Sequence, residues 1–238
     1  MTHEQPGGDV EMATAFEAPA GEAESEQARP RSADRLRRNA VQVVALTLLL
    51  ATVLEVLLAL AAFLIGEAGE GVRPFLLEWV QRLPWALIVC VGIWVGLTTG
   101  QGRLVPLALA GLLAAPVASL VARMAALGLE AAFVNPPAGP SPLAIAALRA
   151  LEYMSVALAV GWLSHGPHPR PQLHAVAGFM IGALFGLALL VLTTLSGGSL
   201  EISLAFVAAW IVNELLFPAG CALILSRVAR TQARPISV

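Results

Sequence analysis

The chain has 238 residues, of which 58% are hydrophobic and 13% are charged, with a formal net charge of −2. Soluble domains carry about twice that share of charged residues. The apolar residues fall in runs of roughly twenty, the length that crosses a hydrocarbon core of about 30 Å. A transmembrane β-barrel is excluded because its strands read as short alternating segments. We therefore predict an all-α polytopic membrane protein, a bundle of six transmembrane helices with a disordered acidic N-terminal tail.

The predicted cytoplasmic tail covers residues 1–38. Residues 1–28 hold seven acidic residues and no Arg, whereas residues 29–38 hold five Arg. The acidic stretch is rich in Gly, Pro, Ser and Glu, a composition that buries too little apolar surface to fold. No basic and apolar leader opens the chain, so we expect no cleaved signal peptide.

A transmembrane domain is predicted over residues 39–228. Its six spans cover residues 41–66, 84–100, 104–133, 143–164, 173–195 and 202–226. Between the first two spans, residues 72–83 mix apolar and charged side chains, which favours an amphipathic helix in the membrane interface. Residues 229–238 form a second short cytoplasmic tail.

The distribution of arginines predicts the orientation of the spans. With the N-terminus inside, ten Arg fall on the cytoplasmic face and four on the outer face. Cytoplasmic loops of membrane proteins carry the excess of basic residues, so both termini are expected in the cytoplasm. In a bacterium this topology places the protein in the inner membrane.

Two predicted spans carry the same pattern, GxxxGxxxG. The first seam is formed by Gly92, Gly96 and Gly100, and the second seam by Gly178, Gly182 and Gly186. Glycines four residues apart share a helix face and let a neighbouring backbone approach closely. Both seams are expected in the inner half of the bilayer, so we predict that the second and fifth spans pack together as an antiparallel pair. The alternative is that each seam packs elsewhere or at an oligomer interface.

Four charged residues lie toward the outer ends of the third and fourth spans. This predicted outer charge cluster consists of Arg123, Glu130, Arg149 and Glu152. Spacings of seven and three residues put each pair on one helix face. We expect an ion-pair cluster that pins the two spans together. The alternative is an entrance for a ligand or an ion.

Two carboxyl groups, Glu55 and Glu214, lie near the middle of their spans, where the sequence places no Arg. A buried carboxyl group without a cationic partner is neutral and can carry a proton or bind a cation. Pro218 has no N–H, so it frees the carbonyl group of Glu214 and opens the helix beside Asn213. We predict a solute or cation site formed by Glu214, Asn213 and Glu55. The alternative is that the carboxyl groups only fasten helices together.

No spacing in the chain matches a hydrolase, nucleotide-binding or zinc motif. We therefore predict no catalytic residue, no metal and no cofactor, and we do not favour an enzyme. The preferred interpretation is a small integral membrane protein that moves or gates a small solute or cation. The alternative is a non-catalytic scaffold or anchor subunit of a larger membrane complex. The expected partners are the lipid bilayer and a membrane protein or a second copy of the chain, without nucleic acid.

Overall fold

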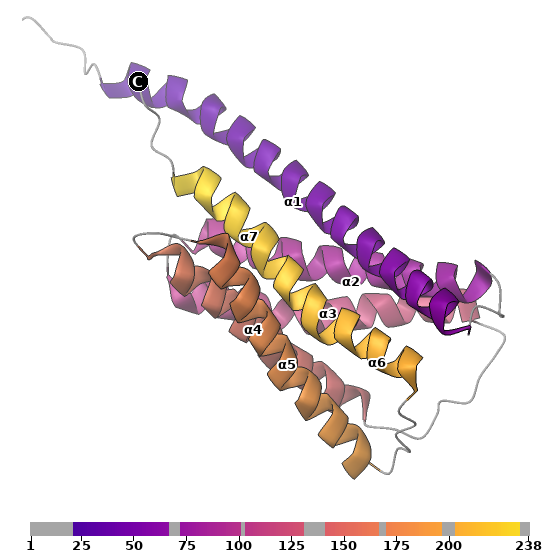
Figure 1. Ribbon diagram of the computed structural model, residues 1–238. Coiled ribbons are helices and arrows are strands. Elements are labelled where there is room, and N and C mark those ends of the chain that lie inside the picture. Colours follow the sequence, from indigo (N-terminus) through magenta and orange to yellow (C-terminus); the bar gives the residue numbers. More distant parts are fainter. Residues whose placement is uncertain are drawn as a thin grey trace, which may run out of the picture. The chain divides into compact units, whose positions relative to one another are not determined.

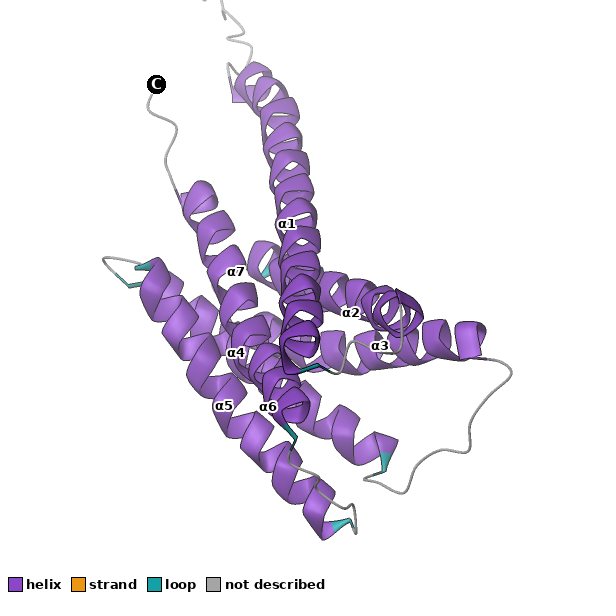
Figure 2. Cartoon of the chain, turned by 45° about the vertical axis from the view of Figure 1, so that its right-hand side comes forward, coloured by secondary structure: helices purple, strands orange, loops and turns teal. Residues whose placement is uncertain are grey.

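The computed structural model describes residues 21–66, 72–100, 103–130, 141–166, 170–196 and 203–233. Within these residues every regular element is a helix (Figure 2). The elements are α1 (Gly21–Ile65), α2 (Val72–Thr99), α3 (Leu104–Glu130), α4 (Pro142–Ser164), α5 (Pro171–Leu195), α6 (Leu204–Trp210), the π-helix η2 (Ile211–Leu216) and α7 (Phe217–Ala233). The chain divides into two compact units, Met1–Arg38 and Asn39–Val238. The helical bundle is the second unit.

Among the described residues, six helices are long and apolar enough to cross a membrane, which confirms the six predicted apolar spans. They cover Ala33–Ile65, Trp79–Thr99, Leu104–Ala122, Pro142–Ser164, Pro171–Leu195 and Leu204–Ala229. The last of them is composed of α6, η2 and α7, which follow one another without a break. The all-helical bundle inferred from composition is therefore the observed architecture.

Two helices begin earlier than the sequence suggested. Helix α1 starts at Gly21, so residues 21–38 are helical although their composition predicted disorder. Ala, Glu and Arg dominate this stretch, and all three have high helix propensity. Helix α2 starts at Val72 and continues through Pro84, so residues 72–83 are continuous with the second span. Their location in a membrane interface stays a prediction, and residues 1–20 and 234–238 lie outside the described residues.

Within the bundle, α2 packs against α3, α3 against α4 and α4 against α5, and α5 packs along η2 and α7 (Figure 1). Helix α4 contacts α7 as well, so α4, α5 and the last span form one packed group. The bundle part of α1 joins through side chains. Leu50 of α1 lies against Gly220 of α7, and Glu55 of α1 pairs with Arg82 of α2.

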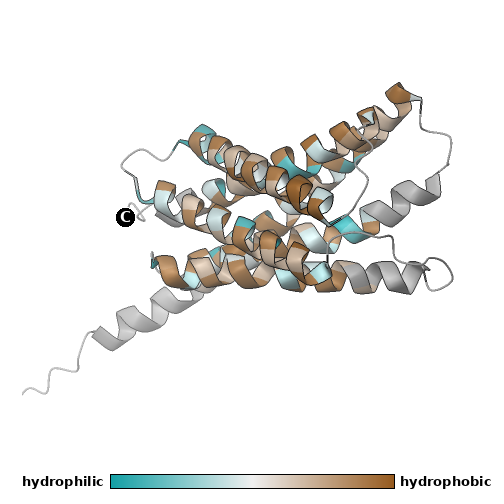
Figure 3. Ribbon diagram, turned by 90° about the horizontal axis from the view of Figure 1, so that it is seen from below, coloured by the Kyte–Doolittle hydropathy of each residue, from teal (hydrophilic) through white to brown (hydrophobic). Residues whose placement is uncertain are grey.

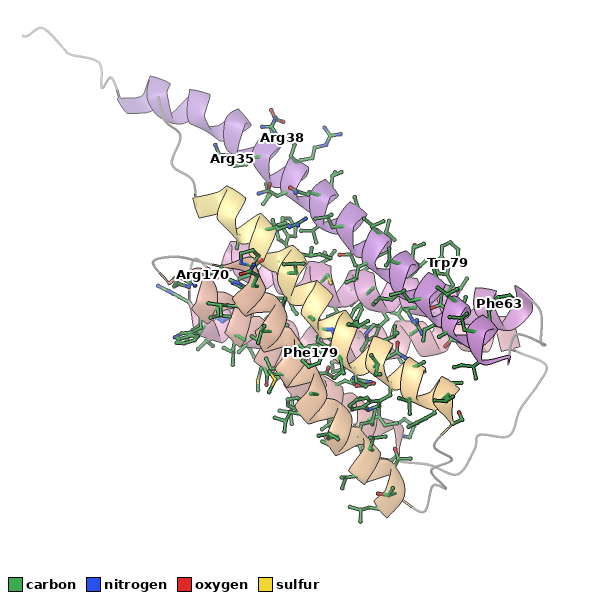
Figure 4. All side chains as sticks on the ribbon, viewed as in Figure 1. Arg35, Arg38, Phe63, Trp79, Arg170 and Phe179 are labelled. Atoms are coloured by element: carbon green, nitrogen blue, oxygen red, sulfur yellow. The ribbon has the colours of Figure 1, made fainter. Side chains whose placement is uncertain are left out.

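The bundle is apolar outside and holds charges inside. Apolar residues make up most of the coloured helical ribbon (Figure 3). Phe63 on α1 and Phe179 on α5 are examples of large exposed apolar side chains (Figure 4). By contrast, Glu55, Glu152 and Glu214 are buried. This distribution suits a protein whose surroundings are lipid, because charged groups inside a membrane face the interior of the bundle.

The two glycine seams pack against different neighbours, so the predicted pairing of the second and fifth spans is wrong. A Cβ atom added at Gly92 would lie 2.8 Å from the Cβ of Ala114 on α3, and one at Gly96 would collide with Ala110. The second seam instead faces the last span, with Gly178 against the carbonyl group of Pro218. Helix α3 follows α2 in the chain and presents small residues on which the first seam can pack. The spacing of the glycines does not show which helix a seam will contact.

Candidate functional site

The last span contains a widened turn in its middle. In η2 the backbone N–H of Phe217 donates a hydrogen bond to the carbonyl group of Val212, five residues earlier. The next residue, Pro218, has no N–H to donate and disfavours a regular α-turn before it. The opening expected from Pro218 is thus present as a π-helix, and Glu214 lies within it. Such π-turns inside helices are frequent at functional sites.

The second glycine seam, on α5, packs against this widened turn. At Gly182 an added Cβ atom would collide with the carbonyl oxygen of Glu214. At Gly186 it would lie 2.8 Å from the Cβ and 3.1 Å from the Cγ of Glu214. The indole Nε1 of Trp210 also donates a hydrogen bond of 3.4 Å to the carbonyl oxygen of Gly186. The glycines therefore let α5 fix both the backbone and the side-chain stem of Glu214.

Arg149 of α4 binds Glu214 with both ends of its guanidinium group. Its Nη1 lies 2.6 Å from Oε2 of Glu214, and its Nη2 lies 2.5 Å from Oε1. The same Nη1 donates to Oε2 of Glu152 at 2.7 Å. One guanidinium thus joins a residue of the predicted outer charge cluster to the carboxyl group predicted at mid-span. The expectation that Glu214 has no salt bridge is wrong.

The error came from estimating depth along each helix. Arg149 lies seven residues, or about 10 Å, from the start of α4, and Glu214 lies ten residues, or roughly 15 Å, from the start of α6. If the spans alternate in direction, both starts are on the same side of the membrane. An arginine side chain is long enough to cover the difference of about 5 Å, since it extends well beyond its own backbone.

Glu55 also has an ionic partner, contrary to the sequence-based expectation. Its Oε2 lies 2.6 Å from Nη1 of Arg82 on α2. The start of the second span had been predicted at Pro84, which left Arg82 outside the bundle. Because α2 begins at Val72, Arg82 is about 15 Å along its helix, and Glu55 is about 15 Å before the end of α1. The two residues therefore meet at the same height.

A cavity of about 570 Å³ reaches these ion pairs. Its polar lining residues come from α2, α4 and the last span and are Gln81, Arg82, Arg149, Asn213 and Glu214. The rest of its lining is rich in alanine and is apolar apart from the hydroxyl group of Tyr153 and the indole N–H of Trp85. A volume of this size is typical of sites for small organic molecules.

One wall of the cavity is aromatic. The rings of Trp85 and Tyr153 have centroids 6.0 Å apart at an interplanar angle of 69°. Those of Tyr153 and Phe217 are 6.1 Å apart at 74°. Both pairs are edge-to-face, a favourable arrangement of aromatic rings. These rings connect α2, α4 and α7 beside Arg149, so the wall is a packed part of the bundle.

The predicted site residues are only partly brought together. Glu214 and Asn213 line the cavity, whereas Glu55 is buried behind it in its pair with Arg82. Within the predicted outer charge cluster, Arg149 and Glu152 are in contact. The side chains of Arg123 and Glu130 lie outside the described residues, so their part of that cluster stays a prediction.

Sequence reasoning missed the cavity residues Gln81, Arg82, Trp85, Tyr153 and Phe217. The available signal was weak, because only the tyrosine is unusual. It is the single Tyr of the chain and directly follows a charged residue inside an apolar run. The other four looked like ordinary members of an interfacial or apolar helix.

The six apolar helices and the charges buried between them define an all-helical bundle of the integral membrane type. Its distinguishing feature is a cavity with ion-paired arginines in the wall. The chain matches no known protein-family model, no curated protein and no solved structure at a significant level.

Proposed function

We propose that this protein moves or gates a small solute or cation across a membrane, and that the solute binds in the cavity beside Glu214. The observation that carries the proposal is the cavity itself. It reaches an ionic pair and two amide side chains in the interior of a bundle whose exterior is apolar. A bundle built only for mechanical support gains nothing from a space of about 570 Å³ at this position.

The widened turn gives the proposed site a part that can move. Glu214 lies in η2, where the regular α-helical bonding pattern is interrupted. Transporters use interrupted helices to bind ions and solutes, since their backbone tolerates rearrangement where it lines a cavity. In this proposal Glu214 exchanges between Arg149 and the solute, Asn213 contacts the solute, and Glu55 holds Arg82 in place. Both termini are proposed to face the cytoplasm of a bacterial cell.

One observation favours the rival interpretation, a scaffold or anchor subunit of a membrane complex. Arg149 and Glu214 form a two-point contact, and such bidentate pairs fix geometry strongly. Under that interpretation the pair fastens α4 to the last span, and the exposed apolar surface binds a partner protein or a second copy. The two functions differ in whether water reaches the cavity from the two sides of the membrane.

The test uses Ala208→Cys, since Ala208 lines the cavity. The matched control is Val207→Cys, because Val207 is the adjacent residue, is exposed on the bundle surface and does not line the cavity. Wild type serves as the blank, because both native cysteines, Cys90 and Cys221, are buried. A charged, membrane-impermeant thiol reagent is applied to sealed vesicles, separately from each side, and labelling is measured by mass spectrometry.

We expect Ala208→Cys to be labelled from both sides and Val207→Cys to stay unlabelled within lipid. Labelling of Ala208→Cys from neither side, together with a stoichiometric protein partner on purification, would replace transport by the scaffold function. Glu214→Gln further distinguishes the transport function from the scaffold function. It should abolish solute movement in a transporter and leave assembly with a partner unchanged in a scaffold.

A further inference from the structure

In the two ion-paired groups, the guanidinium is the partner that faces open space. The Arg149 side chain is 16% exposed, whereas those of Glu152 and Glu214 are 0% and 6% exposed. The Arg82 side chain is 14% exposed and that of Glu55 only 2%. Both arginines line the cavity, while Glu55 and Glu152 do not. The wall of the cavity thus presents two guanidinium groups and the carboxylate of Glu214, whereas Glu55 and Glu152 pair with the guanidiniums from outside the lining.

Arg149 keeps donors to spare. A guanidinium has five N–H groups, and Arg149 uses two on Nη1 and one on Nη2 for its bonds to Glu152 and Glu214. The remaining N–H of Nη2 and the N–H of Nε make no hydrogen bond to the described residues. They lie on one edge of the guanidinium plane and form a second fork. A fork of two parallel N–H groups matches the two oxygens of a carboxylate.

The remaining lining residues suit a ligand with one polar end. The amides of Gln81 and Asn213 add hydrogen-bond donors near the arginines. By contrast, Leu58, Phe217 and several alanines offer only apolar surface, and the ring of Trp85 is apolar apart from its indole N–H. Chloride would leave this apolar wall unused, so the lining indicates an organic body.

We propose that the cavity binds a small organic monocarboxylate with an apolar body, and that its carboxylate binds the guanidinium of Arg149. This inference rests on the proposed function and names the chemical class of the solute. The second fork of Arg149 argues against an amine at this position, because an ammonium group carries only hydrogen-bond donors and the fork offers no acceptor.

Charge balance adds a proton to the proposal. Among the described side chains, Glu55, Glu152 and Glu214 face Arg82 and Arg149, which leaves one net negative charge when all are ionised. A monocarboxylate alone would double that charge, and a phosphate dianion would triple it. The bound anion occupies the second fork of Arg149, and one proton from the surrounding buffer binds to the carboxylate of Glu214. The net charge of the site then stays constant, so carboxylate and proton bind together.

The test is calorimetric titration of the full chain in lipid nanodiscs, with empty nanodiscs as the blank. Benzoate, benzamide and benzylamine share one ring and differ in carrying an anion, a neutral amide and a cation. We expect benzoate to bind about tenfold more tightly than either analogue, as a charge-assisted fork requires. Titration in two buffers of different ionisation enthalpy measures proton uptake, and we expect about one proton per benzoate.

Two variants and one control assign the effect to the proposed residues. Glu214→Gln should still bind benzoate but without proton uptake, because its amide cannot accept the proton. Arg149→Lys should weaken benzoate binding about tenfold, since lysine has no fork. Leu184→Ala is the control, because Leu184 is 65% exposed on α5 and does not line the cavity, and it should leave both measurements unchanged.

Benzoate binding no tighter than that of benzamide would overturn this inference, and so would a preference for benzylamine. Equal proton uptake by wild type and Glu214→Gln would remove Glu214 from the proton step. The proposed function is judged separately by labelling of Ala208→Cys. Labelling from both sides without benzoate binding overturns only the carboxylate proposal, whereas absence of labelling and of binding overturns both.

Discussion

The two glycine seams share one sequence pattern and have different consequences. The first seam lets α2 lie against small side chains of α3, such as Ala110 and Ala114. The second seam lets α5 lie against the backbone of the last span at Glu214 and Pro218. In the first case the neighbour is the next helix in sequence and its contact surface is apolar. In the second case the neighbour carries a widened turn and a paired carboxylate.

The difference shows that a glycine seam allows two helices to approach closely, and that the residues of the neighbouring helix determine the consequence of that contact. Along α2 and α3 close approach gives dense packing of two apolar helices. Along α5 and η2 it brings a backbone carbonyl group and the stem of Glu214 against glycines, which positions the carboxylate for Arg149. We therefore expect changes near the second seam to alter binding, and changes in the first seam to alter stability alone.

The largest expected effect comes from removing the charge that the second seam helps to position. Arg149→Gln leaves Glu152 and Glu214 without their guanidinium. Breaking a buried pair by removing one partner costs about 3–5 kcal/mol. We expect a marked fall in the thermal unfolding midpoint of the purified protein, measured by tryptophan fluorescence. We also expect benzoate binding to be lost.

The comparison variant is Arg82→Gln, which takes the guanidinium from one carboxylate, Glu55. Its thermal midpoint should fall less than that of Arg149→Gln. An equal or larger fall would mean that the Arg149 group is not the centre of the charge network.

An intermediate effect is expected from Gly182→Ala. The added methyl group collides with the carbonyl oxygen of Glu214, which belongs to the backbone and has no room to rotate away. Overpacking of this kind costs about 1–3 kcal/mol, and it should push η2 away from α5. We expect lower stability together with benzoate binding weakened about tenfold, as one charge-assisted contact is lost. Loss of stability with unchanged binding would show that the second seam does not position Glu214.

The smallest expected effect is in the first seam, where the collision can be relieved. Gly96→Ala puts a methyl group against that of Ala110 and should destabilise the protein by about 1 kcal/mol, the lower limit of the usual cost of overpacking. Gly96→Ala combined with Ala110→Gly transfers the methyl group from α3 to α2 and should restore most of that stability. Chemical denaturation in mild detergent measures all three proteins. A double variant no more stable than Gly96→Ala would contradict the observed α2–α3 contact, and benzoate binding should be unchanged throughout.

Much of the fold follows from local sequence. Runs of about twenty apolar residues predicted the six spans, because backbone groups in lipid must bond within their own helix. Pro218 predicted an opened turn at Glu214, since a missing N–H has the same local effect in any helix. Composition was less reliable at the N-terminal end, where residues 21–38 are helical.

The residues that line the cavity were predicted only in part. Glu214 and Asn213 were singled out because polar residues inside an apolar run are conspicuous, and both line the cavity. Their cationic partner was missed, because a small error in depth along two helices separated Arg149 from Glu214. Arg82 was missed for a related reason, since the second span was predicted to start at Pro84, whereas residues 72–83 belong to the same helix. The length of an arginine side chain and the residue at which its helix begins determine which carboxylate that arginine can contact.

The sequence by itself determined the class of element, the number of spans and the opened turn, because each depends on interactions within about one helical stretch. Only the tertiary structure decided which helix each glycine seam contacts and which arginine binds each carboxylate. Those choices depend on helix packing between segments far apart in the chain, as with Arg149 and Glu214, which are 65 residues apart. A cavity, which is a space left between several helices, has no counterpart in any single segment of the sequence.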